Sequence, residues 1–380
     1  MSHKLLNGVR VVSLEQYISG PYCTSILASL GAEVLKVENP RTGGDPRRRY
    51  TPLRDGISSG FAGYNRGKRS VALDFDEAEG ACRLTDLIAE SDVLVSNLRP
   101  GALQRRGIGA SSLRDRYPSL IICEITGFGV SGGPYGDWPA FDSVIQAMSG
   151  LSSVLPPGSD GRPALAPMST TDIQAGTWAA LGILAALVRR RETGDGTHID
   201  AAMYDIAVAA LERPLTLLEF GMPPNEGGRD AQSAVGVFRA LGGWVAIVIP
   251  TDDMWRRCCS AIAREDLLDD ERLRTLEGRA AHMTGVIVPA LEDWAISRRL
   301  DATECSEQLR AHGQPAGAVQ SLNHVRECVH LAHRQLFEPL QDAAAPAPRL
   351  PRFPLLFDGE ALPSGAIPDL GEYDVGAPPR

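Results

Sequence analysis

The stretch GVRVVSLEQYISGPYCTSILASLGAEVLKVENP, residues 8–40, decides the fold class. Its apolar run at 9–14 has the length of a buried strand, residues 20–32 have a helical composition, and 33–38 form a second apolar run. Two strands joined by a helix make a βαβ unit, in which the strands lie parallel. We therefore expect a parallel sheet to begin near the N-terminus.

The same alternation continues along the chain. Further strands are expected at 70–75, 93–98 and 120–129, and helices at 77–91 and near 111–118. This order predicts an α/β fold with a Rossmann-like, doubly wound parallel sheet. Ligands of such sheets bind outside the carboxyl ends of the strands, so the loops after Leu14, Glu38, Phe75, Leu98 and Thr126 are the first candidates for a site.

A long helix is expected at 172–196, because small and apolar residues recur there at helical spacing and glycines follow. The Pro- and Gly-rich segment 213–230 is typical of a linker. Beyond it we expect a hairpin at 235–250 and then helices from Thr251 onward, which together predict a second, smaller α+β domain. From residue 346 the proline content favours an extended tail.

Charge and cysteine usage narrow the function classes. The 38 Lys and Arg against 47 Asp and Glu give a net charge of -9, which argues against nucleic-acid binding. The 7 cysteines are odd in number and include no CxxC pair, as in reduced proteins. Neither a signal peptide nor an apolar run long enough to cross a bilayer is evident. We expect a soluble cytoplasmic protein that does not bind membranes.

No single motif in the sequence is enough to indicate the function. GFGVSG, residues 127–132, satisfies GxGxxG, but Gly133 and Pro134 follow and break a helix where a dinucleotide fingerprint would start one. No metal-ligand spacing is evident, although histidines stand at 330 and 333, and no GxSxG elbow occurs. The basic run 47–49 is either a solvated face or a phosphate contact.

Asp172 is the most informative carboxylate, and two interpretations stay open on the residues alone. It precedes a long helix, and Ser169 three residues earlier completes the pattern of a capping box, which favours a structural role. A carboxylate at a helix N-terminus also suits a nucleophile, because the helix dipole would keep it ionised near neutral pH.

An ordered series of strings resembles the family III CoA-transferases, the family of formyl-CoA and carnitine CoA-transferases. The series covers nearly the whole chain. It comprises residues 8–40, GGDPRR, YNRGKRSVALD, SDVLVSNLRPGALQRRGIG, ITGFGVSGGPYGDWPAFDSVIQAMSG, DIQAGTWAALGILAALVRRRETGDGTHIDAAMYD, HGQPAGAVQSLNHV and LGEYD.

The resemblance implies a large CoA-binding, Rossmann-like domain from residues 1–215 and 335–380, a small α+β domain from 216–334, and an interlocked homodimer. It implies transfer of CoA between an acyl-CoA donor and a free carboxylic acid, with Asp172 as the catalytic nucleophile. An aspartyl anhydride and then an aspartyl-CoA thioester would form on Asp172. No permanent cofactor and no metal are implied, since coenzyme A is a substrate.

By the same resemblance, the residues expected to contact CoA and its acyl group are Gln16, Tyr17, Ile18, Ser19, Leu73, Asn97, Leu98, Arg99, Arg105 and Phe141. Trp138 and the segment 220–235 are further candidates for the acyl pocket. A glycine-rich lid described for some members has only Gly227-Gly228 and Gly242-Gly243 as counterparts here. The donor and acceptor acids stay open.

Three rivals remain. An acyl-CoA racemase of the same fold needs the histidine of a GHD string, and the matching residues here are Ala140, Phe141 and Asp142. A nucleotide-dependent oxidoreductase would depend on GFGVSG alone. A catalytically silent CoA-binding partner protein would lack the nucleophile, and Asp172 is present.

Overall fold

The computed structural model describes residues 5–222, 234–341 and 343–373. The chain divides into two compact units. Unit 1 comprises Met1–Arg213 and His330–Arg380, and unit 2 comprises Pro214–Val329.

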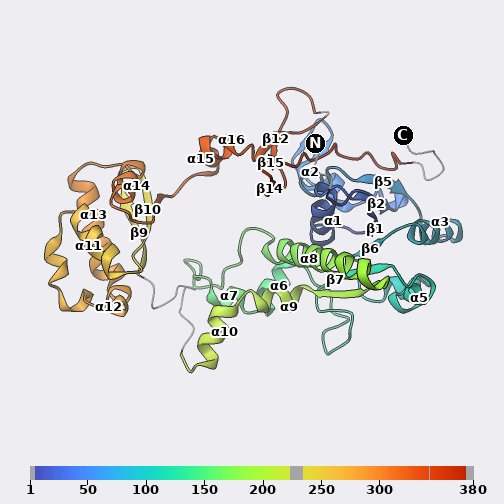
Figure 1. The fold of residues 1–380 in the computed structure, drawn as a ribbon, viewed down its shortest axis with the longest axis horizontal. Coiled ribbons are helices and arrows are strands. Elements are labelled where there is room, and N and C mark those ends of the chain that lie inside the picture. Colours follow the sequence, from blue (N-terminus) through green and yellow to red (C-terminus); the bar gives the residue numbers. More distant parts are fainter. Residues whose placement is uncertain (1–4, 223–233, 342, 374–380) are drawn as a thin grey trace. The chain divides into compact units, whose positions relative to one another are not determined.

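Unit 1 is built on a six-stranded sheet with the spatial order β5-β2-β1-β6-β7-β8 (Figure 1). The strands are β1 Arg10–Leu14, β2 Glu33–Glu38, β5 Arg69–Ala72, β6 Val93–Ser96, β7 Ile121–Thr126 and β8 His198–Ala202. Every neighbouring pair is parallel. The order grows outward in both directions from β1, as in Rossmann sheets. The predicted α/β class with a parallel sheet is confirmed.

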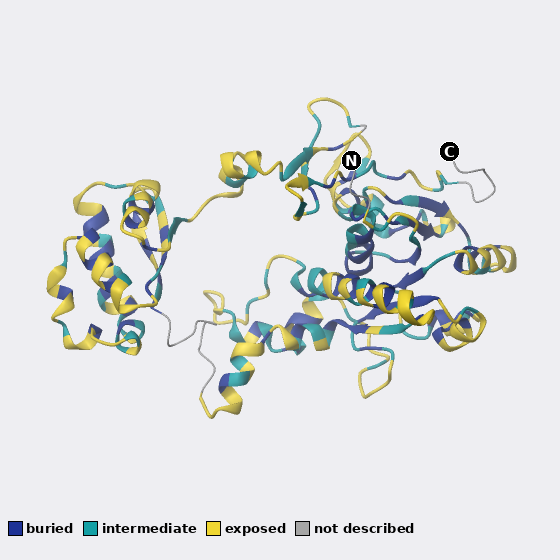
Figure 2. Cartoon of the chain, in the orientation of Figure 1, coloured by how far each residue is buried: buried dark blue, intermediate teal, exposed yellow. Residues whose placement is uncertain are grey.

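Both faces of the sheet are covered, because successive strand residues point to opposite sides. Val11 packs in the core beneath α1 (Ser19–Ser29) and α8 (Thr170–Thr193). Its neighbour Val12 packs in the opposite core, beneath α3 (Ala78–Ala89) and α5 (Ala110–Arg116). Figure 2 shows the buried strands lying between exposed helix faces.

Shorter helices complete unit 1 and lead out of it. They are α2 Ser59–Asn65, α4 Ala102–Arg105, α6 Asp142–Met148, α7 Leu151–Val154, α9 Met203–Ala209 and α10 Glu212–Glu219. The linker expected at 213–230 is thus wrong for its first part, since α10 occupies it. Residues 223–233, which include Gly227-Gly228, lie outside the described residues.

Unit 2 has its own core. Its antiparallel sheet comprises β9 Val235–Ala240, β10 Gly243–Val248 and β11 Ala316–Ala318, and its helices are α11 Asp252–Ala261, α12 Leu276–Ala281, α13 Val288–Ser297 and α14 Ala302–Ala311. The expected hairpin is confirmed, and Gly242 lies in its turn with a φ of 69°. Thr251 caps α11 as expected, accepting the Met254 N–H at 3.2 Å.

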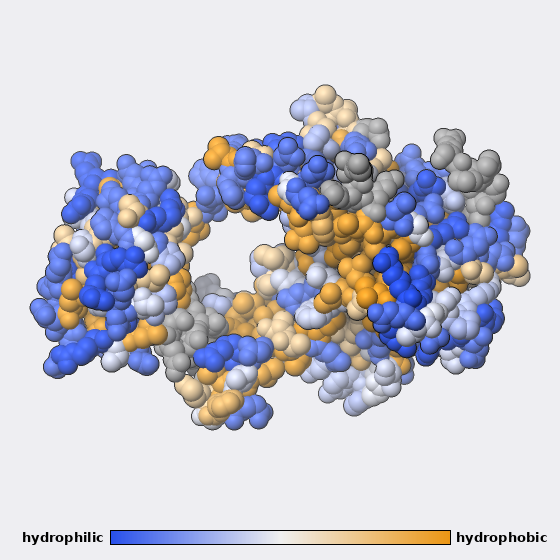
Figure 3. Space-filling model, viewed as in Figure 1, coloured by the Kyte–Doolittle hydropathy of each residue, from blue (hydrophilic) through white to orange (hydrophobic). Residues whose placement is uncertain are grey.

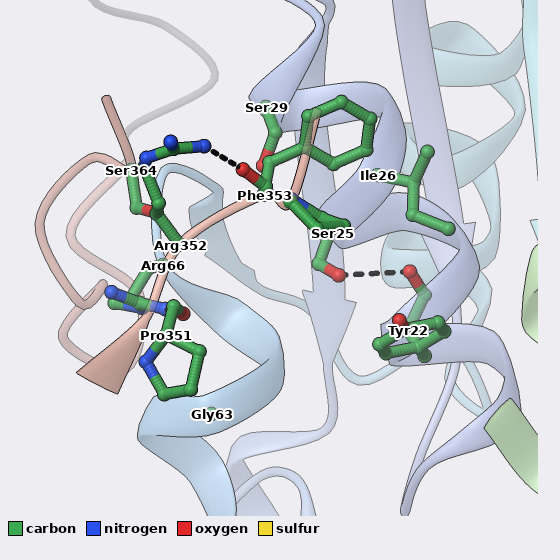
Figure 4. A pocket seen from close by; sticks show the side chains of 11 residues that line it. Tyr22, Ser25, Ile26, Ser29, Gly63, Arg66, Pro351, Arg352, Phe353 and Ser364 are labelled. Carbon is green, nitrogen blue, oxygen red and sulfur yellow. Dashed lines mark hydrogen bonds between the residues drawn. The ribbon is translucent and has the colours of Figure 1, made fainter. Parts of the chain in front are cut away.

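The C-terminal segment returns to unit 1. After α15 Leu322–Arg326 and α16 Val329–His333 it forms the short pairs β12 Phe337–Pro339 with β13 Arg349–Pro351 and β14 Leu356–Phe357 with β15 Glu360–Ala361. Figure 4 shows it beside α1 and α2, where Tyr22, Arg66 and Phe353 help to enclose a cavity of about 80 Å³. The buried Arg352 donates to the carbonyl of Phe353 there.

One helix among the described residues, α8, has the length and composition of a membrane span. No apolar run of this length was expected from the sequence, so α8 differs from that expectation. The many alanines of α8 raise its average hydropathy, and 44% of its most apolar window is buried inside unit 1. A core helix of a globular protein meets the same criteria, so α8 is weak evidence for a membrane.

Candidate active site

Asp172 lies in the first turn of α8 but does not form the expected capping box. The helix begins at Thr170, and Ser169 at the N-cap makes no side-chain capping hydrogen bond. The cap is supplied by Asp142 at the start of α6. Its Oδ1 accepts the backbone N–H of Thr171 at 2.8 Å and that of Asp172 at 3.3 Å. The backbone of Asp172 is therefore held by a second carboxylate.

The side chain of Asp172 meets the N-terminus of a different helix. Ser19, the first residue of α1, lies close enough for its hydroxyl and its backbone N–H to lower the pKa of the Asp172 carboxylate. The N-cap of α1, Ile18, supplies no side-chain hydrogen bond of its own. The start of α8 is thus capped by a carboxylate from α6, and the Asp172 side chain lies at the positive end of the α1 dipole.

Close packing of α1 on α8 makes this contact possible. Gly176 follows Asp172 by one turn, and a Cβ added to it would lie 2.6 Å from the Ser19 carbonyl oxygen and 3.0 Å from the Cys23 nitrogen. Real Cβ contacts are never so short, so only glycine allows the two helices to approach this far. Gly176 therefore brings Ser19 within reach of Asp172.

The pKa of Asp172 is raised from 3.8 to about 6. Burial is the main cause, and the negative charge of Asp142 adds to it, while the donors of Ser19 and the charge of Arg47 oppose the rise. The helix dipole therefore does not hold the pKa of this carboxylate at its ordinary value. Near neutral pH the group is still mostly ionised, and it is poorly solvated, as a reactive carboxylate should be.

The loop after β1 forms another wall of the site. Oδ1 of Asn97 accepts the Gln16 N–H at 2.8 Å, and its Nδ2 donates to the Gln16 carbonyl at 2.7 Å. One amide side chain therefore holds both backbone groups of Gln16. Tyr17 adopts a φ of 64°, which is unusual for a residue with a bulky side chain. Its N–H donates to Asp45 at 3.3 Å, and its ring meets Phe141 edge-on, with centroids 5.3 Å apart.

A cavity of about 300 Å³ opens in front of Asp172. Of the residues expected from the sequence, it is lined by Gln16, Tyr17, Ser19, Asn97, Leu98, Arg99, Phe141 and Asp172. Trp138 also lines it, as expected for the acyl pocket. The loops after β1, β6 and β7 meet here, at the carboxyl ends of the strands.

Two further hollows lie at the same end of the sheet. Gln16 and Leu98 also line a narrow hollow with Asn39 and Phe75. Phe75 in turn borders an open hollow of about 550 Å³ that contains Arg105. The edge therefore carries a row of hollows from Asp172 to beyond β5.

Three expected residues do not line the cavity at Asp172. Arg105 is exposed and lines the third hollow, and no ion pair involving its side chain occurs within the described chain. Leu73 is buried in the core against α3, and Ile18 is buried at the start of α1. Neither of the last two side chains faces the cavity at Asp172.

The backbone N–H groups of the GFGVSG turn are hydrogen-bonded to a carboxylate of the same chain. Asp200 on β8 accepts the backbone N–H groups of Val130 at 3.0 Å and Ser131 at 2.9 Å. These are the donors that a dinucleotide phosphate would use, so the turn is tied to its own sheet. This arrangement disfavours an oxidoreductase built on that motif.

Sequence reasoning missed other residues of the site. Met203 lines the cavity because it follows β8, a strand that was not expected. Tyr64 on α2 and Arg47 are close enough to interact electrostatically with Asp172. The basic run 47–49 was noted in the sequence, but no motif connected Arg47, Tyr64 or Met203 with Asp172, since they come from separate elements that only the fold brings together.

Comparisons with known proteins agree with this geometry. The model of CoA-transferase family III matches residues 6–374. The succinate–glutarate CoA-transferase of Agrobacterium fabrum is 34% identical over 327 residues, covering 83% of this chain and 80% of that protein. The succinyl-CoA–L-malate CoA-transferase beta subunit of Chloroflexus aurantiacus is also 34% identical, covering 83% and 78%.

Among solved structures, a CAIB/BAIF family protein from Brucella suis superimposes with a TM-score of 0.83 at 30% identity, covering 97% of this chain and 96% of that one. The match therefore includes both units as well as the sheet edge. With the family model spanning nearly all of the sequence, the chain belongs to CoA-transferase family III and is a CoA-transferase.

Proposed function

We propose that the protein moves CoA from an acyl-CoA to a free carboxylic acid by covalent catalysis on Asp172. The observation that carries the proposal is the half-buried Asp172 carboxylate, which faces both the Ser19 donors and the cavity. Asp142 anchors the Asp172 backbone on one side, and the cavity leaves the other side open to a thioester.

The reaction begins with attack of an Asp172 oxygen on the thioester carbonyl, which expels CoA thiolate and leaves a mixed anhydride. The thiolate then attacks the aspartyl carbonyl, so that the donor acid leaves and an aspartyl-CoA thioester remains. The acceptor carboxylate attacks this thioester, which expels CoA thiolate and forms a second mixed anhydride. The thiolate then attacks the acyl carbonyl of that anhydride, which gives the new acyl-CoA and releases the Asp172 carboxylate. Atoms and charges balance at each step without an external acid or base.

The developing oxyanions need donors at the aspartyl carbonyl. The Ser19 N–H and hydroxyl lie beside this carboxylate and lower its pKa, so they are placed to donate to those oxyanions. Because burial excludes water from one side of Asp172, the anhydride is also protected from hydrolysis there.

The row of hollows offers a path for CoA. We propose that the acyl group lies in the cavity with Phe141 and Trp138, that the pantetheine passes Gln16 and Leu98, and that the nucleotide reaches Arg105. Arg99 and Arg105 are exposed cations, and neither forms an ion pair within the described residues. Phosphates in an acidic protein need such local cations.

We propose that the two units act as a large and a small domain, near the expected boundaries at 215 and 335, and that the enzyme is a cytoplasmic homodimer. Trp178, Leu181 and Val188 lie on one face of α8 and are each more than half exposed. Figure 3 shows apolar surface over this part of unit 1. A patch of this kind favours a protein interface. Two different subunits would be the alternative, since the Chloroflexus relative is named as a beta subunit.

The proposal is tested by incubating the enzyme with an unlabelled acyl-CoA and an isotopically labelled acid. Label should enter the thioester fraction, and Asp172→Ala should abolish the transfer. Hydroxylamine added during turnover should convert the intermediate to a hydroxamate at Asp172, which peptide mass spectrometry would locate. Normal transfer by the Ala variant would rule out this mechanism, and exchange of the α-proton without transfer would favour the racemase.

A further inference from the structure

Arg47 is held rigidly beside the site. It lies in the short 3-10 turn Pro46–Arg49, and its Nε donates to the Gly60 carbonyl at 2.9 Å. Its guanidinium carbon lies 5.4 Å from the ring centroid of Tyr50 and 5.4 Å from that of Tyr64. A guanidinium fixed in this way loses little conformational freedom when it binds an anion.

The terminal nitrogens of Arg47 have no protein acceptor among the described residues. Its neighbours in the basic run differ. Arg48 pairs with Glu38 at 2.6 Å, and Arg49 donates to the Gly43 carbonyl at 2.9 Å. These nitrogens are not buried, so their donors are accessible to an anion from outside the chain.

That anion would lie close to Asp172. Oδ1 of Asp45 accepts the backbone N–H of Arg47 at 3.0 Å and that of Tyr17 at 3.3 Å, and Tyr17 lines the cavity at Asp172. The charge of Arg47 also lowers the pKa of Asp172. Yet Arg47 and Asp172 do not form an ion pair, for which the nitrogen and oxygen would have to lie within 4.0 Å. The two groups are therefore near neighbours with a gap between them.

We propose that Arg47 binds the distal carboxylate of a dicarboxylic acid while the other carboxylate reacts at Asp172. This inference rests on the proposed function. The reacting carboxylate loses its charge when it becomes a thioester, whereas the distal one stays anionic in both the free acid and the acyl-CoA. A fixed cation can therefore hold the distal group throughout the reaction, and it selects acids that have one.

The test compares matched acids at pH 8, where Asp172 is ionised whether or not Arg47 is present. Succinate is paired with butyrate and glutarate with valerate, and kcat/KM is measured for wild type, Arg47→Gln and Arg49→Gln. Because Arg47→Gln loses a charge-assisted contact, its kcat/KM for both dicarboxylates should fall on the order of 100-fold. The monocarboxylates should change little, and Arg49→Gln should match wild type.

Equal losses of kcat/KM for both acids of a pair would overturn the inference, because Arg47 would then act on the nucleophile or on the reacting carboxylate. Wild-type preference for the monocarboxylates would overturn it as well. Calorimetric titration of the enzyme with succinate gives a readout that needs no turnover. Binding that is lost in Arg47→Gln but kept in Asp172→Asn supports the site even if covalent catalysis at Asp172 fails, and binding unaffected by Arg47→Gln contradicts it.

Discussion

Oδ1 of Asp142 lies 3.3 Å from the backbone nitrogen of Asp172, so one carboxylate fixes the position of another. The same oxygen accepts the Thr171 N–H and hydroxyl, and the second oxygen accepts Nε2 of Gln146 at 2.6 Å. The negative charge that anchors the first turn of α8 also raises the pKa of Asp172. Position and reactivity are thereby coupled through Asp142.

Replacing Asp142 with Asn should move the acid limb of the pH–activity profile to lower pH. The variant keeps an oxygen for the Thr171 N–H but removes the charge, so the pKa of Asp172 should fall below about 6. The measurement is kcat/KM against pH from about 4.5 to 8. Loss of the Gln146 contact should cost about 1 kcal/mol of stability, which a denaturant titration would register. A profile superimposable on wild type would show that Asp142 acts only as a cap.

Asp172→Asn should stabilise the folded protein at neutral pH while abolishing transfer. The folded-state pKa of about 6 exceeds the ordinary 3.8, so the folded state binds a proton more tightly. Stability therefore falls as pH rises between these values, and the cost above pH 6 is at most about 3 kcal/mol. Thermal melts should show a higher Tm for the variant at pH 7.5 and no difference near pH 4. A variant that is less stable at pH 7.5 would contradict the raised pKa.

Gly176→Ala should separate α1 from α8. The added Cβ meets backbone atoms of Ser19 and Cys23 that cannot move without displacing α1. We expect a loss of about 1–3 kcal/mol in stability and a lower kcat, because Ser19 would be drawn away from Asp172. Gly182→Ala in the same helix is the matched control, since its nearest neighbour is an Ile199 carbon at 3.5 Å. Similar effects of the two substitutions would mean that helix packing at Gly176 is not the cause.

Much of the fold could be predicted because strand signals were local. Runs such as residues 9–14 and 33–38 are rich in Val and Leu, as buried strands are, although the buried Lys36 and Glu38 interrupt the second. The strand β8, His198–Ala202, escaped prediction because HIDAA has only one large apolar side chain. Pairing with β7, which places Cys123 opposite Ile199, stabilises it instead. That information is absent from the segment itself.

The site was predictable where it follows from the sheet and unpredictable where it depends on distant partners. The loops containing Gln16 and Asn97 follow strands, so the rule for strand ends located them. The cap of α8 comes from Asp142, 30 residues before Asp172, and the capping pattern at Ser169 pointed to the wrong residue. Local sequence can propose a cap, but tertiary contacts decide which carboxylate supplies it.

Asn97→Ala should weaken CoA binding more than chemistry. The amide holds the Gln16 peptide through two hydrogen bonds and donates to the Ser19 hydroxyl at 3.2 Å. Without it the loop after β1 should loosen, raising KM for acyl-CoA about tenfold. Asn97→Asp keeps the acceptor for the Gln16 N–H but loses both donors, so its KM should lie at or above that of the Ala variant. A KM near wild type in both variants would mean that the loop is held by Asp45 alone.

Arg105→Gln should raise KM for acyl-CoA about tenfold without changing kcat, because Arg105 lies two hollows away from Asp172. Acyl-pantetheine, which lacks every phosphate of CoA, should be used equally well by wild type and variant. The KM of the variant should also depend less on salt than that of wild type, since one charged contact is gone. Arg114→Gln, an exposed arginine at the opposite edge of the sheet, is the control and should behave as wild type. If Arg105→Gln impairs both substrates alike, the nucleotide does not reach this hollow, and the path of CoA along the sheet edge must be redrawn.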